Sequence, residues 1–382
     1  MSRLIRTSTV ALSLDYLLKG QLNFLNRHFE VLAVSGKDRH LQNVADREGV
    51  RVFSLGMNRA IRPVADLISL WRLYRLFKKE RPEIVHSITP KAGLLSMVAA
   101  KMAGVPIRMH TFTGLIFPSK KGVFQKLLIV TDRLLCWAAT NVYPEGNGVM
   151  NDLIHYKITS KPLKVLANGN VNGIDTAYFS SVTITSETKE VLKAKLAITQ
   201  ESFTFVFVGR LVGDKGINEL VQAFNELTIP NIRLILVGSY EHELDPLKLQ
   251  TLSKIEENPN IFAVGFQNDV RPYLAVSDCL VFPSYREGFP NVVMQAGAMN
   301  LPAIVTDING CNEIIVEGIN GTIIPPKNTE LLHLAMLEMI NNSDKFSDLK
   351  ANARQMIISR FEQKVVWEEL LKEYKRLQGN VH

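Results

Sequence analysis

Two stretches of the sequence combine glycines with charged side chains in a way suited to binding phosphate. In residues 205–216, a strand-like run of aromatic and β-branched residues ends at Gly209, and Arg210 and Lys215 follow it. Two cations and glycine-freed backbone N–H groups at a strand-to-helix turn can cradle a phosphate group. The stretch lacks the G-x-G-x-x-G and G-x-x-x-x-G-K-[ST] patterns of nucleotide sites. It is therefore either a phosphate site of another kind or a surface loop with two solvated cations.

The second stretch, residues 281–297, places a charged loop between a predicted strand and a predicted helix. Pro290 suits the first helical position, and Gln295 follows Glu287 by eight positions, so both side chains are expected on the ligand side. Glu287 can bind hydroxyl groups while the helix start binds phosphates through free backbone N–H groups, those of Asn291, Val292 and Val293. The alternative is a charged loop before an ordinary core helix.

Strand-like apolar runs alternate with helical patterns along the chain, which is typical of βαβ units and parallel sheets. The predicted strands of the first half are Leu4–Val10, Glu30–Ser35, Val50–Ser54, Ile84–Ser87, Ile107–Thr111, Asn141–Pro144 and Lys164–Leu166. Those of the second half are Thr204–Gly209, Arg233–Gly238, Ile261–Val264, Cys279–Pro283, Ala303–Thr306 and Thr322–Ile324. The pattern restarts, so two doubly wound α/β units in tandem are predicted, with ligands at the carboxyl ends of the strands.

A cluster of turn formers at residues 168–175 predicts the domain boundary. We therefore expect an N-terminal domain at residues 1–172 and a second domain at residues 173–357. The tail continues a helical pattern after the second sheet is complete, and its last part, residues 358–382, is expected to pack back on the first domain.

The chain of 382 residues has a net charge of +7 and three cysteines, which excludes a disulfide framework. Residues 1–175 hold 25 Lys and Arg against 12 Asp and Glu, a net +13, and the remainder holds 19 against 25, a net −6. A basic first half suggests a polyanionic partner. No signal peptide or membrane span is evident in the sequence, so the protein is expected to be cytoplasmic.

The motifs R-x4-K-G, E-G-F-P-N-V and, at Thr306 to Ile315, T-D-I-x-G-x-N-E-I-I resemble those of retaining glycosyltransferase family 4. The resemblance covers nearly the whole chain and is greatest to enzymes of bacterial capsule and surface polysaccharide synthesis. It implies the GT-B fold, an α/β architecture of two Rossmann-like doubly wound domains facing across a cleft. It implies that Arg210 and Lys215 bind the donor pyrophosphate, that Glu287 contacts donor-sugar hydroxyls, and that backbone N–H groups contribute from Gly288, Phe289, Pro290, Asn291 and Val292 as far as each has one.

Two positions depart from the family pattern. The second acidic residue of its E-x7-E motif, which holds the ribose hydroxyls, is Gln295 here, and an amide forms no charge-assisted bond. The histidine that many relatives carry before the glycine of an N-terminal loop is replaced by Thr113, and His110 lies three residues earlier. His110 is either a residue facing the reaction centre or a structural histidine at a strand end.

Further candidate contacts lie in the first half. Ser13 and Lys19 follow the first strand and are candidates for acceptor or phosphate binding. Helical stretches near residues 62–80 and 121–139 combine cations with Trp, Tyr and Phe, which suits an anionic membrane surface as well as an ordinary amphipathic helix. No nucleic-acid motif and no metal-ligand spacing accompany the cations, so neither nucleic acid nor a metal is expected.

With the resemblance supplying the reaction, these motifs predict a metal-independent retaining hexosyl- or N-acetylhexosaminyltransferase. It would move a sugar from a nucleotide donor, a UDP-sugar by expectation, to a polyprenyl-linked acceptor at the inner face of the membrane. Two alternatives stay open at this stage: a non-catalytic glycosyltransferase-like scaffold and a non-hydrolysing UDP-sugar epimerase.

Overall fold

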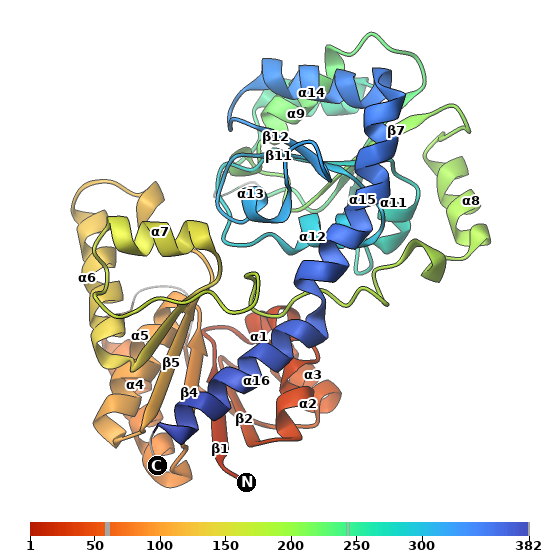
Figure 1. The fold of residues 1–382 in the computed structure, drawn as a ribbon. Helices are drawn as coiled ribbons and strands as arrows, with labels where there is room; N and C mark the ends of the chain where they lie inside the picture. Colours follow the sequence, from red (N-terminus) through yellow and green to blue (C-terminus); the bar gives the residue numbers. More distant parts are fainter. Residues whose placement is uncertain (58–61, 242, 244, 381–382) are drawn as a thin grey trace. The chain divides into compact units, whose positions relative to one another are not determined.

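The structure is a computed structural model that describes residues 1–57, 62–241, 243 and 245–380 (Figure 1). It divides into two compact units. Unit 1 comprises Met1–Gly173 with Gln363–His382, and unit 2 comprises Ile174–Glu362. The chain therefore crosses between the units at residues 173/174 and again at 362/363, one and five residues after the positions expected from the sequence.

Unit 1 contains a six-stranded parallel sheet of order β3-β2-β1-β4-β5-β6. Its strands are β1 (Arg3–Thr7), β2 (Glu30–Ser35), β3 (Arg51–Ser54), β4 (Ile84–Ile88), β5 (Ile107–Phe112) and β6 (Asn141–Pro144). Its helices are α1 (Ala11–Leu17), α2 (Gln21–Asn26), α3 (Arg39–Glu48), α4 (Pro63–Glu80), α5 (Pro90–Ala103), α6 (Gly122–Ala138), α7 (Asn147–His155) and α16 (Gln363–Gly379).

Both faces of this sheet are buried because successive strand residues point to opposite sides. Leu4 of β1 packs with the apolar residues of α1, α2 and α16, and Ile5 packs in a second cluster with those of α4, α5 and α6. Figure 1 shows α16 lying along the strands of unit 1. The tail is thus a structural part of unit 1.

Unit 2 repeats the architecture with a parallel sheet of order β12-β11-β10-β7-β8-β9. Its strands are β7 (Phe203–Val208), β8 (Ile232–Val237), β9 (Ile261–Gly265), β10 (Cys279–Phe282), β11 (Ala303–Thr306) and β12 (Gly321–Ile324). Its helices are α8 (Ser186–Lys195), α9 (Ile217–Asn225), α10 (Leu249–Glu257), α11 (Arg271–Ala275), α12 (Asn291–Ala298), α13 (Cys311–Ile314), α14 (Thr329–Asn341) and α15 (Ser343–Phe361).

Some predicted elements differ from those observed. The predicted strand Lys164–Leu166 is wrong, since these residues form no strand and only the preceding Leu163 makes an isolated bridge, to Val142. The helical segment that follows β1 is divided into α1 and α2 by Gly20, whose φ of 82° is left-handed. The helical tail is broken at Glu362, whose extended backbone separates α15 from α16.

Candidate active site

The loop that follows β7 carries the first predicted cation. Gly238, at the end of the neighbouring β8, approaches this loop so closely that a Cβ there would lie 1.7 Å from the carbonyl oxygen of Gly209. The Arg210 side chain is 52% exposed and forms an ion pair with Glu241. Arg210 is therefore accessible at the carboxyl end of β7.

Lys215 is held beside the end of β10 by a second close approach. It closes a short 3-10 turn, Gly213–Lys215, and Gly216 follows with a φ of 71°. A Cβ on Gly216 would lie 2.1 Å from the carbonyl oxygen of Pro283. Only glycine combines this φ with this contact, so the loop after β7 is locked to the loop after β10.

The structure brings Lys215 and Glu287 together in an ion pair between side chains that are only 17% and 16% exposed. The buried Ser284 hydroxyl donates to Glu287 Oε1 at 2.8 Å, and Oε1 also contacts Lys215. Among the described residues, Oε2 has no hydrogen-bond partner. Glu287 therefore keeps one carboxylate oxygen available as an acceptor.

The backbone beside Glu287 leads into α12. The predicted start of this helix is corrected by one residue, since Pro290 is the N-cap and Asn291 the first helical residue. No side chain caps this end and no acidic residue lies in its first turn. The positive end of the helix dipole and its first N–H groups are thus suited to an anion.

Gly310 fixes the other side of this loop. Its φ is 76°, and a Cβ there would lie 2.4 Å from the carbonyl oxygen of Gly288. The Phe289 side chain points into the core, where its ring lies 5.5 Å from that of Phe361. Phe289 therefore anchors the loop, and only its backbone is available to a ligand.

Gln295 lies in the second turn of α12 and is partly buried. Its side chain forms no hydrogen bond with the rest of the described chain. The amide is free to bind a ligand from the same helix whose N-terminus lies next to Glu287.

Sequence reasoning missed a second set of contacts that joins the two loops. The Tyr285 N–H donates to the Asp214 carbonyl at 2.9 Å, and Arg286 pairs with the Asp214 carboxylate at 3.2 Å. Burial, followed by the hydrogen bond to Glu219, raises the pKa of the Tyr285 phenol. Tyr285 and Arg286 directly precede Glu287 in the motif, but nothing in the sequence indicated their partner Asp214, which lies 72 residues before Arg286.

The charge of Glu287 also affects a cysteine of the neighbouring α13. Burial, and next the negative charge of Glu287, hold the pKa of the Cys311 thiol well above its ordinary value, with Lys215 acting in the opposite direction. Cys311 is therefore a neutral thiol beside the ion pair and has no nucleophilic role.

In unit 1 the structure corrects the expectation that His110 faces a reaction centre. Its side chain is buried, and Nδ1 lies 2.8 Å from the Ser87 hydroxyl. The ring fills the space over Gly93 of α5, where a Cβ would lie 2.4 Å from His110 Cε1. Burial lowers the pKa of His110 to about 3, so it is a neutral residue of the core.

The remaining predicted residues of unit 1 are separated from one another. Thr113 is partly exposed just after β5. Ser13 lies in the first turn of α1, whereas Lys19 follows the last turn of this helix. Ser13 and Lys19 are thus at opposite ends of α1 and do not lie in one loop.

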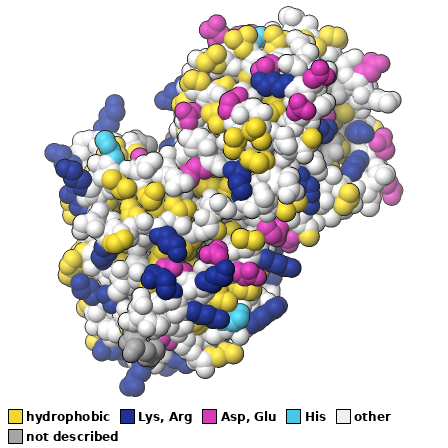
Figure 2. Space-filling view, in the orientation of Figure 1, with side chains coloured by type: hydrophobic (Ala, Val, Ile, Leu, Met, Phe, Trp, Pro, Cys, Tyr) yellow, Lys and Arg dark blue, Asp and Glu magenta, His cyan; other side chains and the backbone are white. Residues whose placement is uncertain are grey.

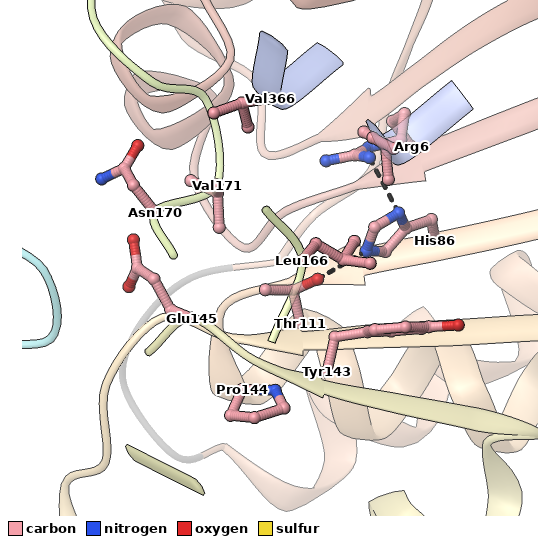
Figure 3. Close-up of a pocket in the computed structure, with 11 residues that line it drawn as sticks. Arg6, His86, Thr111, Tyr143, Pro144, Glu145, Leu166, Asn170, Val171 and Val366 are labelled. Atoms are coloured by element: carbon pink, nitrogen blue, oxygen red, sulfur yellow. Dashed lines mark hydrogen bonds between the residues drawn. The ribbon is translucent and has the colours of Figure 1, made fainter. Parts of the chain in front are cut away.

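A small cavity of about 20 Å³ lies inside unit 1 next to Arg6 and His86 (Figure 3). Arg6 Nη1 lies 2.8 Å from His86 Nδ1 and 2.7 Å from the Tyr374 hydroxyl of α16, and His86 Nε2 lies 2.8 Å from Thr111 Oγ1. The cavity has room for about one water molecule. These residues attach α16 to the sheet and cannot enclose a sugar.

Among the described residues, no three His, Cys, Asp or Glu side chains form a group that could hold a metal ion. Within the same residues, no helix is both long and apolar enough to cross a membrane.

Comparisons with known proteins identify the family of this chain. Residues 23–169 match the glycosyl transferase 4-like domain, and residues 188–356 match the family of glycosyl transferases group 1. The capsular polysaccharide biosynthesis glycosyltransferase CapM of Staphylococcus aureus is 31% identical over 93% of this chain and 92% of its own length. The chain therefore belongs to the group 1 glycosyltransferases, of the capsular and surface polysaccharide type.

Two further similarities bear on the fold and on the acceptor. An Escherichia coli enzyme named UDP-Gal:alpha-D-GlcNAc-diphosphoundecaprenol alpha-1,3-galactosyltransferase is 27% identical over 88% of this chain and 86% of its own. The crystal structure of HepE from Anabaena with UDP superposes with a TM-score of 0.81 at 17% identity, over 98% of this chain and 100% of that one. The fold is thus GT-B, and membership in this family disfavours the epimerase alternative.

Proposed function

We propose that this protein is a retaining glycosyltransferase that moves a sugar from a UDP-sugar to a polyprenyl-diphosphate-linked saccharide. The observation that carries the proposal is the Lys215–Glu287 pair beside the uncapped start of α12. It places a cation, backbone N–H groups and a free carboxylate oxygen within one loop cluster of unit 2. A nucleotide sugar offers the matching groups, phosphates and sugar hydroxyls.

Each group of the site then has a role in donor binding. Arg210 and Lys215 bind the pyrophosphate together with the N–H groups at the start of α12. Glu287 Oε2 accepts hydrogen bonds from sugar hydroxyls. Gln295, four residues into α12, holds a ribose hydroxyl through its amide oxygen. Charge that develops on the leaving phosphate is stabilised by the same cations.

Retention of configuration needs no protein base in this scheme. The leaving phosphate oxygen takes the acceptor proton on the same face of the sugar, and the enzyme supplies positioning and charge stabilisation. The burial of His110 supports this choice, because a side chain inside the core does not reach the acceptor and an imidazole with a pKa lowered to about 3 is too weak a base to hold its proton. Thr113 is available to position the acceptor hydroxyl.

A lipid-linked acceptor fits the charge of unit 1. Residues 1–173 and 363–382 hold 29 Lys and Arg against 14 Asp and Glu, whereas residues 174–362 hold 15 against 23. On the face drawn in Figure 2, Lys and Arg side chains gather over unit 1. The E. coli relative acts on a diphosphoundecaprenol acceptor by its name.

The exposed side of α6 supplies an apolar surface to match these cations. Large apolar side chains recur there at helical spacing, from 43% to 84% exposed, and we call them the α6 stripe: Val123, Leu127, Val130, Leu134 and Trp137. Lys120, Lys121 and Lys126 lie at the start of this helix. An apolar stripe flanked by cations suits the inner face of an anionic membrane.

Donor and acceptor are tested by transfer. The purified protein is incubated with a panel of UDP- and GDP-sugars and a polyprenyl-diphosphate-linked N-acetylhexosamine, and products are separated by mass spectrometry. We expect transfer from one or more UDP-sugars with an α linkage. Binding of no nucleotide sugar in calorimetry contradicts the proposal, and transfer only from a GDP-sugar contradicts the choice of nucleotide.

Site variants test the assignment of residues. Lys215→Ala and Glu287→Ala each should lower turnover at least tenfold, since each removes a charge-assisted contact of about 1.5–3 kcal/mol. Lys193→Ala is the matched control, because Lys193 forms an exposed ion pair with Glu190 on α8 at 3.1 Å. Unchanged turnover in both site variants would show that the donor binds elsewhere.

Membrane binding is tested by sedimentation with vesicles of phosphatidylcholine alone and with phosphatidylglycerol. We expect binding only to the anionic vesicles, and less of it for a variant with Leu127 and Trp137 changed to Asp. Self-association through the α6 stripe, seen as a dimer that this variant abolishes without any vesicle binding in the parent, would contradict the membrane role.

A further inference from the structure

The cations of the donor loops are paired with carboxylates of the protein. Arg210 pairs with Glu241, Lys215 with Glu287, and Arg286 with Asp214 at 3.2 Å. A diphosphate that enters this part of unit 2 therefore competes with carboxylates of the protein for the same cations. Each carboxylate that loses its cation then repels the phosphates, because both groups are negatively charged.

Glu287 differs from the other carboxylates in its geometry. Its Oε1 is held by the Ser284 hydroxyl at 2.8 Å and by Lys215, while Oε2 has no partner among the described residues. The side chain is thus held through one oxygen, and the other oxygen can accept hydrogen bonds from a ligand. Glu241, by contrast, lies beside the exposed Arg210 guanidinium.

The donor and the nucleotide product of a transferase interact differently with Glu287. An intact nucleotide sugar draws Lys215 towards its phosphates but offers sugar hydroxyls to the carboxylate. A free nucleoside diphosphate takes the same cation but has no donor sugar whose hydroxyls could bind the carboxylate. Its negative charge then faces a carboxylate that has lost part of its pairing.

We propose that Glu287 makes the site selective for the intact donor over the free nucleoside diphosphate, through its competing ion pair with Lys215. This inference rests on the proposed donor binding by unit 2. After transfer, the carboxylate recovers Lys215 and weakens the hold on the departing nucleotide. Glu287 thus disfavours product inhibition as well as binding the donor.

The test is calorimetric binding of UDP and of UDP-galactose to the full chain and to Glu287→Gln. The amide keeps the shape but loses the charge. We expect Glu287→Gln to bind UDP about two- to fivefold tighter, since this corresponds to the strength of a partly exposed ion pair. We expect it to bind UDP-galactose about tenfold weaker, since the hydrogen bonds to the sugar hydroxyls lose their charged acceptor. If UDP-galactose does not bind the parent, UDP-N-acetylgalactosamine and UDP-glucose are used in its place.

Glu241→Gln is the matched control, because it frees Arg210 rather than Lys215. We expect it to change both affinities by the same factor within about twofold, since the pyrophosphate is common to both ligands. Thermal unfolding of each variant shows that the fold is kept, and Glu287→Ala provides a second variant with the same expected gain for UDP.

Three outcomes are distinguished. A rise in UDP affinity confined to the Glu287 variants supports the inference. Weaker or unchanged UDP binding by these variants, or an equal change of selectivity in Glu241→Gln, overturns it while the donor site stands. Failure of the parent to bind UDP or any UDP-sugar overturns the proposed donor site and this inference together.

Discussion

The substitution Gln295→Glu probes the position at which this chain departs from its family. Gln295 is partly buried in the second turn of α12, and its amide has no partner in the described chain. A carboxylate there would face the ligand without first losing a contact. Because the position is beyond the first turn, the helix dipole changes the result little.

The expected gain follows from the kind of hydrogen bond. A bond to a charged acceptor contributes about 1.5–3 kcal/mol and a neutral one about 0.5–1.5 kcal/mol. The difference of about 1–2 kcal/mol corresponds to a five- to thirtyfold gain in affinity for UDP. Gln295→Met, which fills the same space without a polar group, should lose affinity instead.

The assay compares UDP with 2′,3′-dideoxy-UDP, which lacks the ribose hydroxyls. The gain should appear for UDP and shrink to within about twofold for the dideoxy compound. An equal gain for both ligands, or none for UDP, would refute the assignment of Gln295 to the ribose. Transfer activity that appears only in Gln295→Glu would show that the native chain is a non-catalytic scaffold.

Two further predictions concern stability. Gly310→Ala forces a Cβ to within 2.4 Å of the Gly288 carbonyl at a φ of 76° and should destabilise unit 2 by about 2–4 kcal/mol in urea unfolding. Gly318→Ala, with a similar φ of 72° and nothing within 4 Å, should cost only about 1–2 kcal/mol, and equal losses would contradict the packing argument. Burial raises the pKa of Asp132 to about 7, so its ionisation destabilises the folded state as pH rises from about 4 to 7. Asp132→Asn should therefore raise the melting temperature most above pH 7 and not at all near pH 4, and a gain independent of pH would contradict the burial of a charge.

The alternation of apolar runs and helical patterns was enough to predict two doubly wound units. Parallel strands covered on both faces are continuously apolar, as in Phe205–Val208, and are hard to mistake. The wrong strand at Lys164–Leu166 was a short segment with one lysine at its end, where local pattern carries little information. The break at Glu362 could not be predicted from the sequence, because both flanking segments have helical patterns. The residue is extended where it pairs with Ile174, which is distant along the chain.

The site was predicted in its motifs but not in its pairings. Lys215 and Glu287 are 72 residues apart in sequence, and they become neighbours because β7 pairs with β10 and Gly216 approaches Pro283 closely. The burial of His110 was equally hidden. All of β5 except Arg108 is buried, so alternation along the strand gives no sign of which face is accessible.

The double crossing of the chain between units sets the order in which unit 1 can be completed during synthesis. Arg6 and His86 are made early, but Tyr374, which bonds to both, is made only after residues 174–362. At about 5–20 residues per second this interval lasts about 10–40 s. During it the nascent sheet of unit 1 lacks the helix that covers the guanidinium on its central strand. Unit 1 therefore cannot complete its core before unit 2 has been synthesised, although the six strands of its sheet are all made first.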